Sequence, residues 1–292
     1  MRKIVYRDFD QAALDREYNN QANVADPAHH IAWYGPASAR ARSRVAHDAG
    51  IAYGGLPDEQ LDIFRPADAG SGDRRPVVIF IHGGAWRSLD LAGSAFAAET
   101  FTARGALYVP LGFSVMPAAG SLDEMVAQVR AGIAWVWQNI ASYGGDPSRL
   151  HLIGHSSGGH LAAMALVTDW QRLYGLPASV IRRCVLVSGL YDLEPVRLSY
   201  RNDMLRLDRA AEIRNSPCRN LPTEGPPTLI AYGQHETSEF KRQAIAFETT
   251  WSTRYGNSRR MELAGVNHYE AIELLVDPES EITQAVTEWF GF

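Results

Sequence analysis

The stretch LHLIGHSSGGHLAAMALV, residues 150–167, says more about the expected fold than any other part of the chain. It starts with an apolar, strand-like run, passes through a glycine-rich turn and continues into helix-forming apolar residues. Gly154, Ser156 and Gly158 match the pattern G-x-S-x-G, whose glycines allow a sharp turn from strand to helix. Such a turn holds the central serine at the carboxyl end of a sheet, beside a helix N-terminus that favours negative charge. Ser156 is therefore the predicted nucleophile.

Ser157 is the competing nucleophile within the same turn. The pattern requires a glycine two positions before the serine, and His155 occupies that place for Ser157. Gly154 meets the requirement for Ser156, so we favour Ser156.

Short apolar runs alternate with helical patterns from residue 76 onward. Most of these runs are apolar at successive positions, as expected for parallel strands that helices cover on both faces. The alternation predicts an α/β protein with a mostly parallel, doubly wound sheet flanked by helices. The expected strands are 76–84, 106–113, 150–156, 184–193, 228–234 and 259–265.

Three of the intervening helices can be placed from their start signals and apolar spacing. Ser121 and Glu124 form a capping box before a long stretch with apolar residues every three or four positions. The same spacing recurs over residues 240–251. Asp277 followed by Pro278 is typical of a cap and first turn, and predicts the start of the last helix.

We expect a single domain over residues 1–292 with two departures from the strand–helix alternation. Residues 1–57 are polar and mixed, and are predicted to wrap around the core as an N-terminal extension leading into an antiparallel strand at 61–66. Residues 194–225 carry no strand pattern and are predicted to form a short, partly helical cap insertion. Insertions of this kind often cover an active site.

Composition and charge narrow the class of protein. The 292 residues carry a formal net charge of −5 without a basic run, which argues against nucleic acid or an anionic membrane as the partner. No apolar stretch approaches the roughly 20 residues of a membrane span, and the N-terminus lacks the apolar region of a signal peptide. We therefore expect a cytoplasmic protein. The sequence leaves open whether it forms a homodimer.

The sequence HGGAW at residues 82–86 directly follows VVIFI, the apolar run of the expected strand 76–84. Acyl transfer places negative charge on a carbonyl oxygen, which preorganised backbone N–H groups stabilise by about 3 kcal/mol. Gly83, Gly84 or Ala85 could donate one or two of these groups, with the N–H of Ser157 completing the oxyanion hole. We expect the ring of His82 to hold this loop in place without transferring a proton.

The base and the acid are expected after the nucleophile, in the order serine, acid, histidine. His268 follows the last expected strand and is predicted to accept the serine proton. Glu236 comes just after the strand 228–234 and is the favoured acid. Asp192, at the end of the preceding strand, and Glu239, at the start of a helix, remain alternatives. No pair of histidines has zinc-site spacing, so we expect no metal.

The motifs HGGAW, GHSSGGH, SGLYDLEP, GQHETSEFKRQ and EYNNQA together resemble the arylformamidase (kynurenine formamidase) family of the α/β-hydrolase superfamily. The resemblance runs from Tyr18 to about His268. It implies an α/β-hydrolase fold and the hydrolysis of N-formyl-L-kynurenine, a step of tryptophan catabolism, without a cofactor. It assigns Ser156 as nucleophile, His268 as base and Glu236 as acid, where the animal enzymes have aspartate.

Several expectations about the substrate accompany this resemblance. Trp86 is predicted to border a small acyl site, and the stretch 111–117 and the insertion 194–225 are predicted to contact substrate. The expected partner is a small aromatic amide or ester. Two other hypotheses remain. One is a carboxylesterase or catabolic amidase acting on another small aromatic or cyclic substrate, and the other is a non-catalytic relative that binds a ligand or partner.

Overall fold

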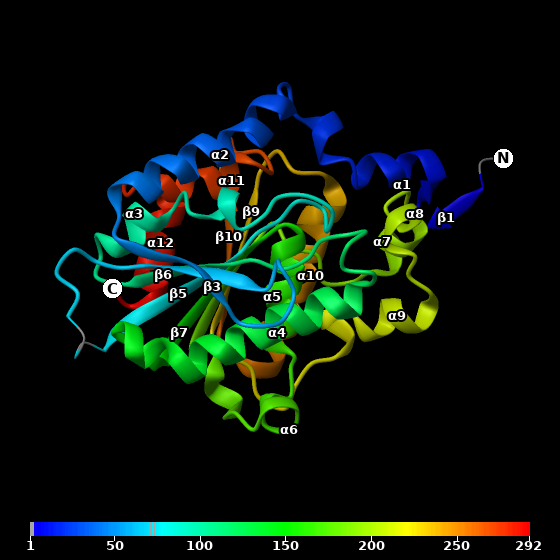
Figure 1. The fold of residues 1–292 in the computed structure, drawn as a ribbon. Coiled ribbons are helices and arrows are strands. Elements are labelled where there is room, and N and C mark those ends of the chain that lie inside the picture. The colour runs from blue at the N-terminus through cyan, green and yellow to red at the C-terminus, as the bar shows by residue number, and fades with distance from the viewer. Residues whose placement is uncertain (1–2, 71, 73) are drawn as a thin grey trace.

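An eight-stranded sheet organises the computed structural model, which describes residues 3–70, 72 and 74–292. The strands lie in the order β10-β9-β8-β7-β5-β6-β4-β3, and all neighbours from β10 to β6 are parallel. The predicted mostly parallel, doubly wound sheet is therefore confirmed (Figure 1). Its strands are β3 (His47–Ala52), β4 (Gln60–Phe64), β5 (Arg75–Ile81), β6 (Leu107–Leu111), β7 (Gly145–His155), β8 (Arg183–Val187), β9 (Thr228–Gly233) and β10 (Ser258–Leu263).

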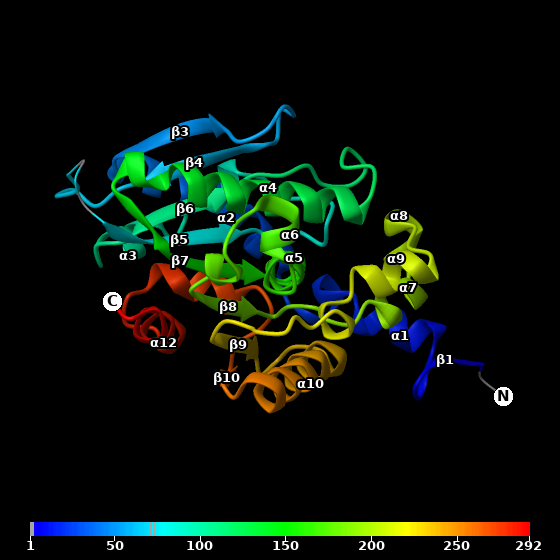
Figure 2. The same ribbon diagram turned by 90° about the horizontal axis from the view of Figure 1, so that it is seen from below.

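Successive residues of the central strands are buried on opposite faces of the sheet. In β5, Val77, Ile79 and Ile81 belong to one core cluster, whereas Val78 and Phe80 belong to a second one. This explains why the strand is apolar at every position, since side chains alternate between faces and helices cover both. Figure 2 shows the strands in their spatial order, from β3 at one edge through β4, β6, β5, β7, β8 and β9 to β10 at the other, with helices on each side.

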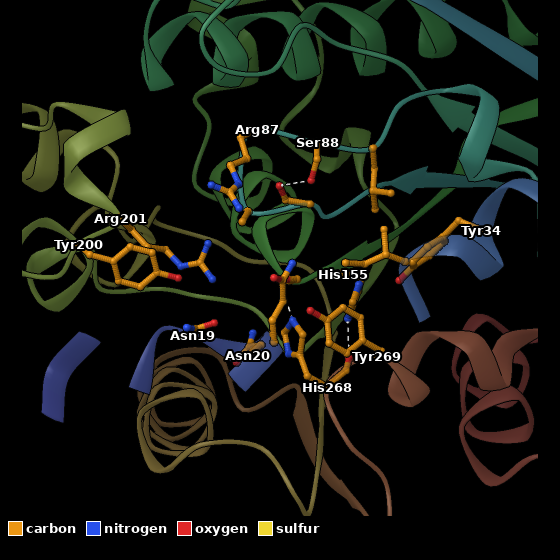
Figure 3. A pocket seen from close by; sticks show the side chains of 16 residues that line it. Asn19, Asn20, Tyr34, Arg87, Ser88, His155, Tyr200, Arg201, His268 and Tyr269 are labelled. Atoms are coloured by element: carbon orange, nitrogen blue, oxygen red, sulfur yellow. Dashed lines mark hydrogen bonds between the residues drawn. The ribbon is translucent and has the colours of Figure 1, made fainter. Parts of the chain in front are cut away.

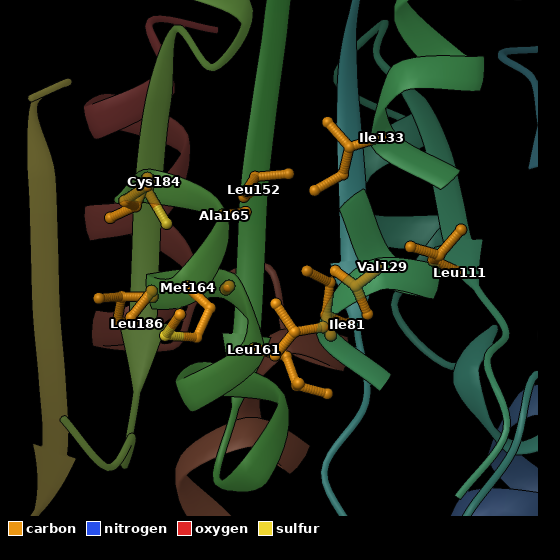
Figure 4. Close-up of a cluster of buried hydrophobic side chains, with 14 of the residues drawn as sticks. Ile81, Leu111, Val129, Ile133, Leu152, Leu161, Met164, Ala165, Cys184 and Leu186 are labelled. Atoms are coloured by element: carbon orange, nitrogen blue, oxygen red, sulfur yellow. The ribbon is translucent and has the colours of Figure 1, made fainter. Parts of the chain in front are cut away.

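The two core clusters assign the helices to the two faces. The first face packs against α4 (Leu122–Asn139), α5 (Ser157–Leu166) and α10 (Ser238–Tyr255), and the second against α2 (Pro27–Arg44), α3 (Ala98–Thr102), α11 (Glu270–Glu273) and α12 (Glu281–Phe290). Figure 4 shows the centre of the first cluster, where Leu161 of α5 lies beside Ile81 of β5 and Met164 lies beside Leu186 of β8. This packing seats α5 and the turn before it rigidly behind the sheet.

The expected helix starts are confirmed in one case and wrong in another. Ser121 caps α4, and its hydroxyl accepts a hydrogen bond from the N–H of Glu124 at 3.2 Å. The last helix begins at Glu281 and not at Asp277–Pro278. Asp277 instead accepts from the N–H two residues later in a local turn, and Ser280 caps α12. Asp277 and Ser280 are both residues that can cap a helix, and the helix uses Ser280, which lies nearer to the apolar residues of α12.

The N-terminal segment 1–57 contributes more than the predicted wrapping. Its last strand, β3, pairs antiparallel with β4 and extends the main sheet, so part of the expected extension belongs to the sheet itself. Upstream lie a small ribbon of β1 (Ile4–Tyr6) and β2 (Phe9–Asp10), then α1 (Gln11–Glu17) and α2. β3 was not predicted because HDAGIA is half-buried and carries one glycine and two charged or polar side chains.

Residues 194–225 contain the short helices α7 (Glu194–Leu198), α8 (Asn202–Leu205) and α9 (Arg209–Arg214). They lie near α1 on one side of the molecule (Figure 1), and the N-terminal segment bonds to them directly. The carboxylate of Asp15 accepts from the N–H of Tyr200 at 2.7 Å. A further helix, α6 (Trp170–Tyr174), follows α5. In the described ranges, no helix has the length and apolar character needed to cross a bilayer.

Candidate active site

Ser156 occupies a strained turn between β7 and α5. Its backbone has φ 55° and ψ −122°, a region that costs a non-glycine residue about 1–3 kcal/mol. The surroundings leave no space for side chains at the flanking glycines. A Cβ on Gly158 would lie 2.2 Å from the carbonyl oxygen of Ile81, and one on Gly154 would lie 2.4 Å from the carbonyl oxygen of Gly158. The turn thus presents the Ser156 side chain at the carboxyl end of the sheet.

His268 is brought to Ser156 by the loop after β10. Its Nε2 lies 2.9 Å from Ser156 Oγ, and its Nδ1 lies 3.0 Å from Oε2 of Glu236. An ionised carboxylate can only accept, so Nδ1–H donates to Glu236, and the free lone pair on Nε2 accepts the Ser156 hydroxyl proton. This arrangement holds the imidazole in the tautomer that a general base requires.

Glu236 is held by two further hydrogen bonds. Its Oε1 accepts from the hydroxyl of Ser188 at 2.6 Å and from the N–H of Gly233 at 2.7 Å. Its side chain is inaccessible to solvent, so the carboxylate cannot turn away from His268.

The other two carboxylates considered from the sequence lie elsewhere. Asp192 accepts from the guanidinium of Arg219 at 3.2 Å, and Glu239 pairs with Arg242 at 2.6 Å. The described contacts of these two acids do not include His268, so the structure brings Glu236 alone among the three to the histidine.

Three rings surround the imidazole of His268. Phe240 and Tyr269 meet it edge to face at centroid distances of 4.9 and 5.6 Å, and His155 lies 5.0 Å away. His155 is not suited to act as the base. Its Nε2–H donates to the carbonyl oxygen of His268 at 2.9 Å, and burial together with the neighbouring His268 lowers its pKa to about 3. It supports the loop that carries His268.

The HGGAW loop adopts a tight left-handed conformation beside Ser156. Gly84, Ala85 and Trp86 have φ values of 102°, 55° and 61°. In residues 3–70, 72 and 74–292, the N–H groups of Gly83, Gly84 and Ala85 meet no hydrogen-bond acceptor. Ser157 is the first residue of α5, so its N–H has no acceptor within the helix. These amides are therefore free to bind an oxygen atom.

Gly83, Gly84 and Ala85 differ in their positions relative to Ser156. Gly84 and Ala85 line the cavity, whereas Gly83 does not and packs closely on the turn, where an added Cβ would be 2.9 Å from the carbonyl oxygen of His155 and 3.1 Å from the Cβ of Ser156. The N–H of Trp86 already donates to the hydroxyl of Ser157 at 3.2 Å, which ties the loop to the start of α5.

Trp86 does not lie where the sequence suggested. Its side chain is 1% exposed and is not part of the cavity wall, so the expected contact with an acyl group is replaced by a role in the core. Its indole N–H donates to Nδ1 of His160 at 3.2 Å, and Nε2–H of His160 donates to the carbonyl oxygen of Asn215 at 2.8 Å. Trp86 thus links the HGGAW loop to the cap insertion through α5.

His82 and most of the stretch 111–117 are also buried, although Pro117 is exposed. The His82 ring stacks on Phe113 at 4.2 Å, and its Nδ1–H donates to the carbonyl oxygen of Gly83 at 2.9 Å. Burial lowers the pKa of His82 to about 4, so the ring is neutral near pH 7. The expectation that residues 111–117 contact substrate is wrong, because they support the loop from behind and do not line the cavity.

A cavity of about 350 Å³ opens above Ser156 and His268 (Figure 3). Its other walls come from the N-terminal segment, the HGGAW loop and the residues after it, the cap and the loop after β10. Sequence reasoning missed most of these residues, although the motif EYNNQA contains three of them and Arg87 directly follows HGGAW. The lining residues are Asn19, Asn20, Gln21, Ile31, Tyr34, Gly84, Ala85, Arg87, Ser88, Leu89, His155, Ser156, Tyr200, Arg201, His268 and Tyr269.

Comparison with known proteins places this geometry among hydrolases. The BD-FAE family model matches residues 61–179. Kynurenine formamidase of Danio rerio is 32% identical over 267 residues, which cover 90% of this chain and 88% of that protein. Kynurenine formamidase of Salmo salar is 30% identical over 298 residues, with 98% of each chain covered. A crystal structure from Silicibacter sp. TM1040, of a protein proposed to be a thioesterase, superposes with a TM-score of 0.80 at 25% identity and covers 94% of this chain and 98% of its own.

Proposed function

This chain belongs to the kynurenine formamidase family of α/β-hydrolases and is a hydrolase of amides or esters, and from that premise we propose that it is a serine hydrolase that cleaves aryl formamides such as N-formylkynurenine through an acyl-enzyme. The observation that carries the proposal is the hydrogen-bonded row from Ser156 through His268 to Glu236, which faces the cavity.

The first half-reaction forms the acyl-enzyme. Ser156 Oγ attacks the formyl carbon while its proton moves to Nε2 of His268, and Glu236 stabilises the resulting imidazolium. The carbonyl oxygen becomes an oxyanion, for which we assign the N–H groups of Gly84, Ala85 and Ser157 as donors because Gly84 and Ala85 line the cavity and Ser157 begins α5. The C–N bond then breaks, and His268 gives its proton to the departing aniline nitrogen.

The second half-reaction releases formate. Water enters the place that the aniline has left, and Nε2 of His268 takes one of its protons as its oxygen attacks the formyl-serine. Collapse of the second tetrahedral intermediate breaks the ester bond, and the proton returns to Ser156 Oγ. Besides the substrate and one water molecule, the steps use the side chains of Ser156, His268 and Glu236 and the backbone amides.

The cavity walls suit an aromatic leaving group. Tyr34, Tyr200 and Tyr269 all line the cavity, and Tyr269 also packs edge to face on His268. Aromatic side chains bind flat ring systems through offset or edge-to-face contacts. A volume of about 350 Å³ is in the range of small-molecule sites.

Hydrolysis of N-formylkynurenine by the purified protein is the direct test of this substrate. We expect kcat/KM of at least about 10⁴ M⁻¹ s⁻¹, the lower end for an enzyme on its own substrate, followed by the absorbance of the free aniline. The Ser156→Ala variant is the matched control. A rate at background in the wild-type protein would remove this substrate.

Esters are the second candidate class, because an ester carbonyl meets the same three groups and the structural neighbour is proposed to act on a thioester. Short 4-nitrophenyl esters measured beside formanilides separate the two functions. A kcat/KM that is higher on acetate esters than on formanilides by about 100-fold would favour the esterase.

The HGGAW loop allows a test of the oxyanion hole. Gly84 has φ 102°, and a Cβ there would lie 1.9 Å from the carbonyl oxygen of Ser88, so Gly84→Ala forces the loop to move. We expect kcat to fall by about 10²-fold, the usual loss when one donor is misplaced, with a smaller change in KM. Gly55→Ala is the matched control, since a Cβ at Gly55 meets no atom within 4 Å. Equal kinetics for the two variants would contradict this role.

A further inference from the structure

Two arginines reach the cavity from separate parts of the chain. Arg87 follows the HGGAW loop, and Arg201 lies in the cap between α7 and α8. Figure 3 shows both guanidinium groups on the same side of the cavity as one another, facing the space beside His268. In the described ranges, neither of them pairs with a carboxylate. Burial and, to a smaller extent, the positive charge of Arg87 lower the pKa of Arg201.

The other arginines of the cap provide a contrast. Arg197 pairs with Glu212 at 2.6 Å, Arg214 with Asp123 at 2.7 Å and Arg219 with Asp192 at 3.2 Å. Acids thus neutralise these three guanidinium groups, whereas Arg206, which is exposed away from the cavity lining, has no carboxylate partner among the described residues. Arg201 also lacks one, but it is half-buried and lines the cavity, so its positive charge faces the site.

Arg201 is held rigidly without being neutralised. Its Nε and Nη2 both donate to the backbone carbonyl oxygen of Tyr18, with Nε at 2.8 Å. A carbonyl oxygen satisfies hydrogen bonds but carries no charge to offset the guanidinium. Burial lowers the pKa of Arg201, and burying a cation without a partner is costly. Its remaining N–H groups are free to bind an anion.

We propose that the cavity selects substrates whose aromatic part carries a carboxylate, which binds between Arg201 and Arg87 while the scissile carbonyl lies at Ser156. This inference rests on the proposed hydrolase function and names its substrate class. A planar guanidinium fork matches a carboxylate in shape and charge. The two arginines thus act as specificity determinants, because they contact a part of the substrate that does not react.

Matched substrates of different charge test the proposal. We would compare 3-acetoxybenzoate with 3-acetoxybenzamide, which share the ester and the ring and differ only in the anionic group. We expect wild-type protein to favour the carboxylate, and the ratio of the two kcat/KM values to fall by about 10-fold or more in Arg201→Gln, mainly through KM. Arg87 is exposed, so we expect the ratio to fall less in Arg87→Gln than in Arg201→Gln. Added salt should lower the ratio of the wild-type protein in part, because it screens an exposed charge.

Arg172→Gln is the matched control, because Arg172 is exposed on α6 and pairs only weakly with Asp169 at 3.5 Å. An unchanged ratio in both Arg201→Gln and Arg87→Gln would overturn the proposal. If kcat/KM in Arg201→Gln then falls equally on both substrates, the loss shows that Arg201 has a structural role and does not select for charge.

A binding measurement separates this inference from the hydrolase function. Calorimetry with benzoate and with benzamide is expected to show tighter binding of benzoate in wild-type protein, and loss of that preference in Arg201→Gln. If Ser156 fails to react with a fluorophosphonate and the protein hydrolyses neither ester, the hydrolase function is wrong. The calorimetric comparison of benzoate with benzamide still tests whether the cavity prefers an anionic ligand.

Discussion

Ser156→Ala is expected to lower kcat by about 10⁵-fold or more on any substrate that the wild-type protein hydrolyses. The physical reason is that Ser156 Oγ forms the covalent bond, and no other hydroxyl is hydrogen-bonded to Nε2 of His268 in the described part of the chain. Losing the nucleophile of a serine–histidine–acid row removes almost all of the chemical rate, and leaves what binding and the oxyanion hole supply. Steady-state kinetics with substrate depletion over hours would measure the residual rate.

Covalent labelling provides the control for this variant. A fluorophosphonate should label wild-type protein at Ser156 and leave Ser156→Ala unlabelled. Ser157→Ala should still be labelled, because the Ser157 hydroxyl accepts from the N–H of Trp86 and does not contact His268. Labelling of Ser156→Ala at Ser157 would transfer the nucleophilic role to its neighbour.

Glu236→Gln is expected to lower kcat by about 10³- to 10⁴-fold with little change in KM. The glutamine carbonyl oxygen can still accept from Ser188 and Gly233, as Oε1 does now, which turns its NH₂ group towards His268. Nδ1 must then accept, so the proton moves to Nε2, where it faces Ser156 and blocks proton transfer. Single-turnover kinetics would show the loss in the acylation step.

Asp192→Asn is the matched control for the acid. Asp192 has 24% of its side chain exposed and bonds to Arg219 and to the N–H of Glu194, so we expect kcat to change by less than about threefold. A large loss in Asp192→Asn with a small one in Glu236→Gln would reverse the assignment of the acid.

The local features of the site could be predicted because they depend on short-range geometry. The turn at Ser156 needs small residues on both sides, and a strand and a helix that follow one another directly; all of this is visible in residues 150–167. The parallel sheet was predictable for a similar reason, since strands covered on both faces are apolar at successive positions. The α4 cap followed from Ser121 and Glu124 alone.

The expectations that failed concerned residues whose environment is set by distant segments. Trp86 at the end of HGGAW suggested a ligand contact, but it is buried and its indole N–H donates to His160 of α5. The strand β3 is only half-buried and lies at the sheet edge, so its sequence lacks the apolar run of a central strand. The cavity wall from Asn19 to Tyr34 comes from the segment that joins α1 to α2, and distant contacts such as that of the Tyr18 carbonyl oxygen with Arg201 of the cap hold this segment in place.

The sequence by itself determined the α/β fold class and the turn that holds Ser156, and it named His268 as the base, because these depend on residue patterns within about 20 positions or on chain order. Only the tertiary structure decided which of three carboxylates meets His268, which side chains line the cavity, and that two arginines face it without acids. The reason is that the contacts of His268 with Glu236 and Ser156 join residues 32 and 112 positions apart. The arrangement of the strands and loops sets the distances between these residues, and no local sequence pattern records it.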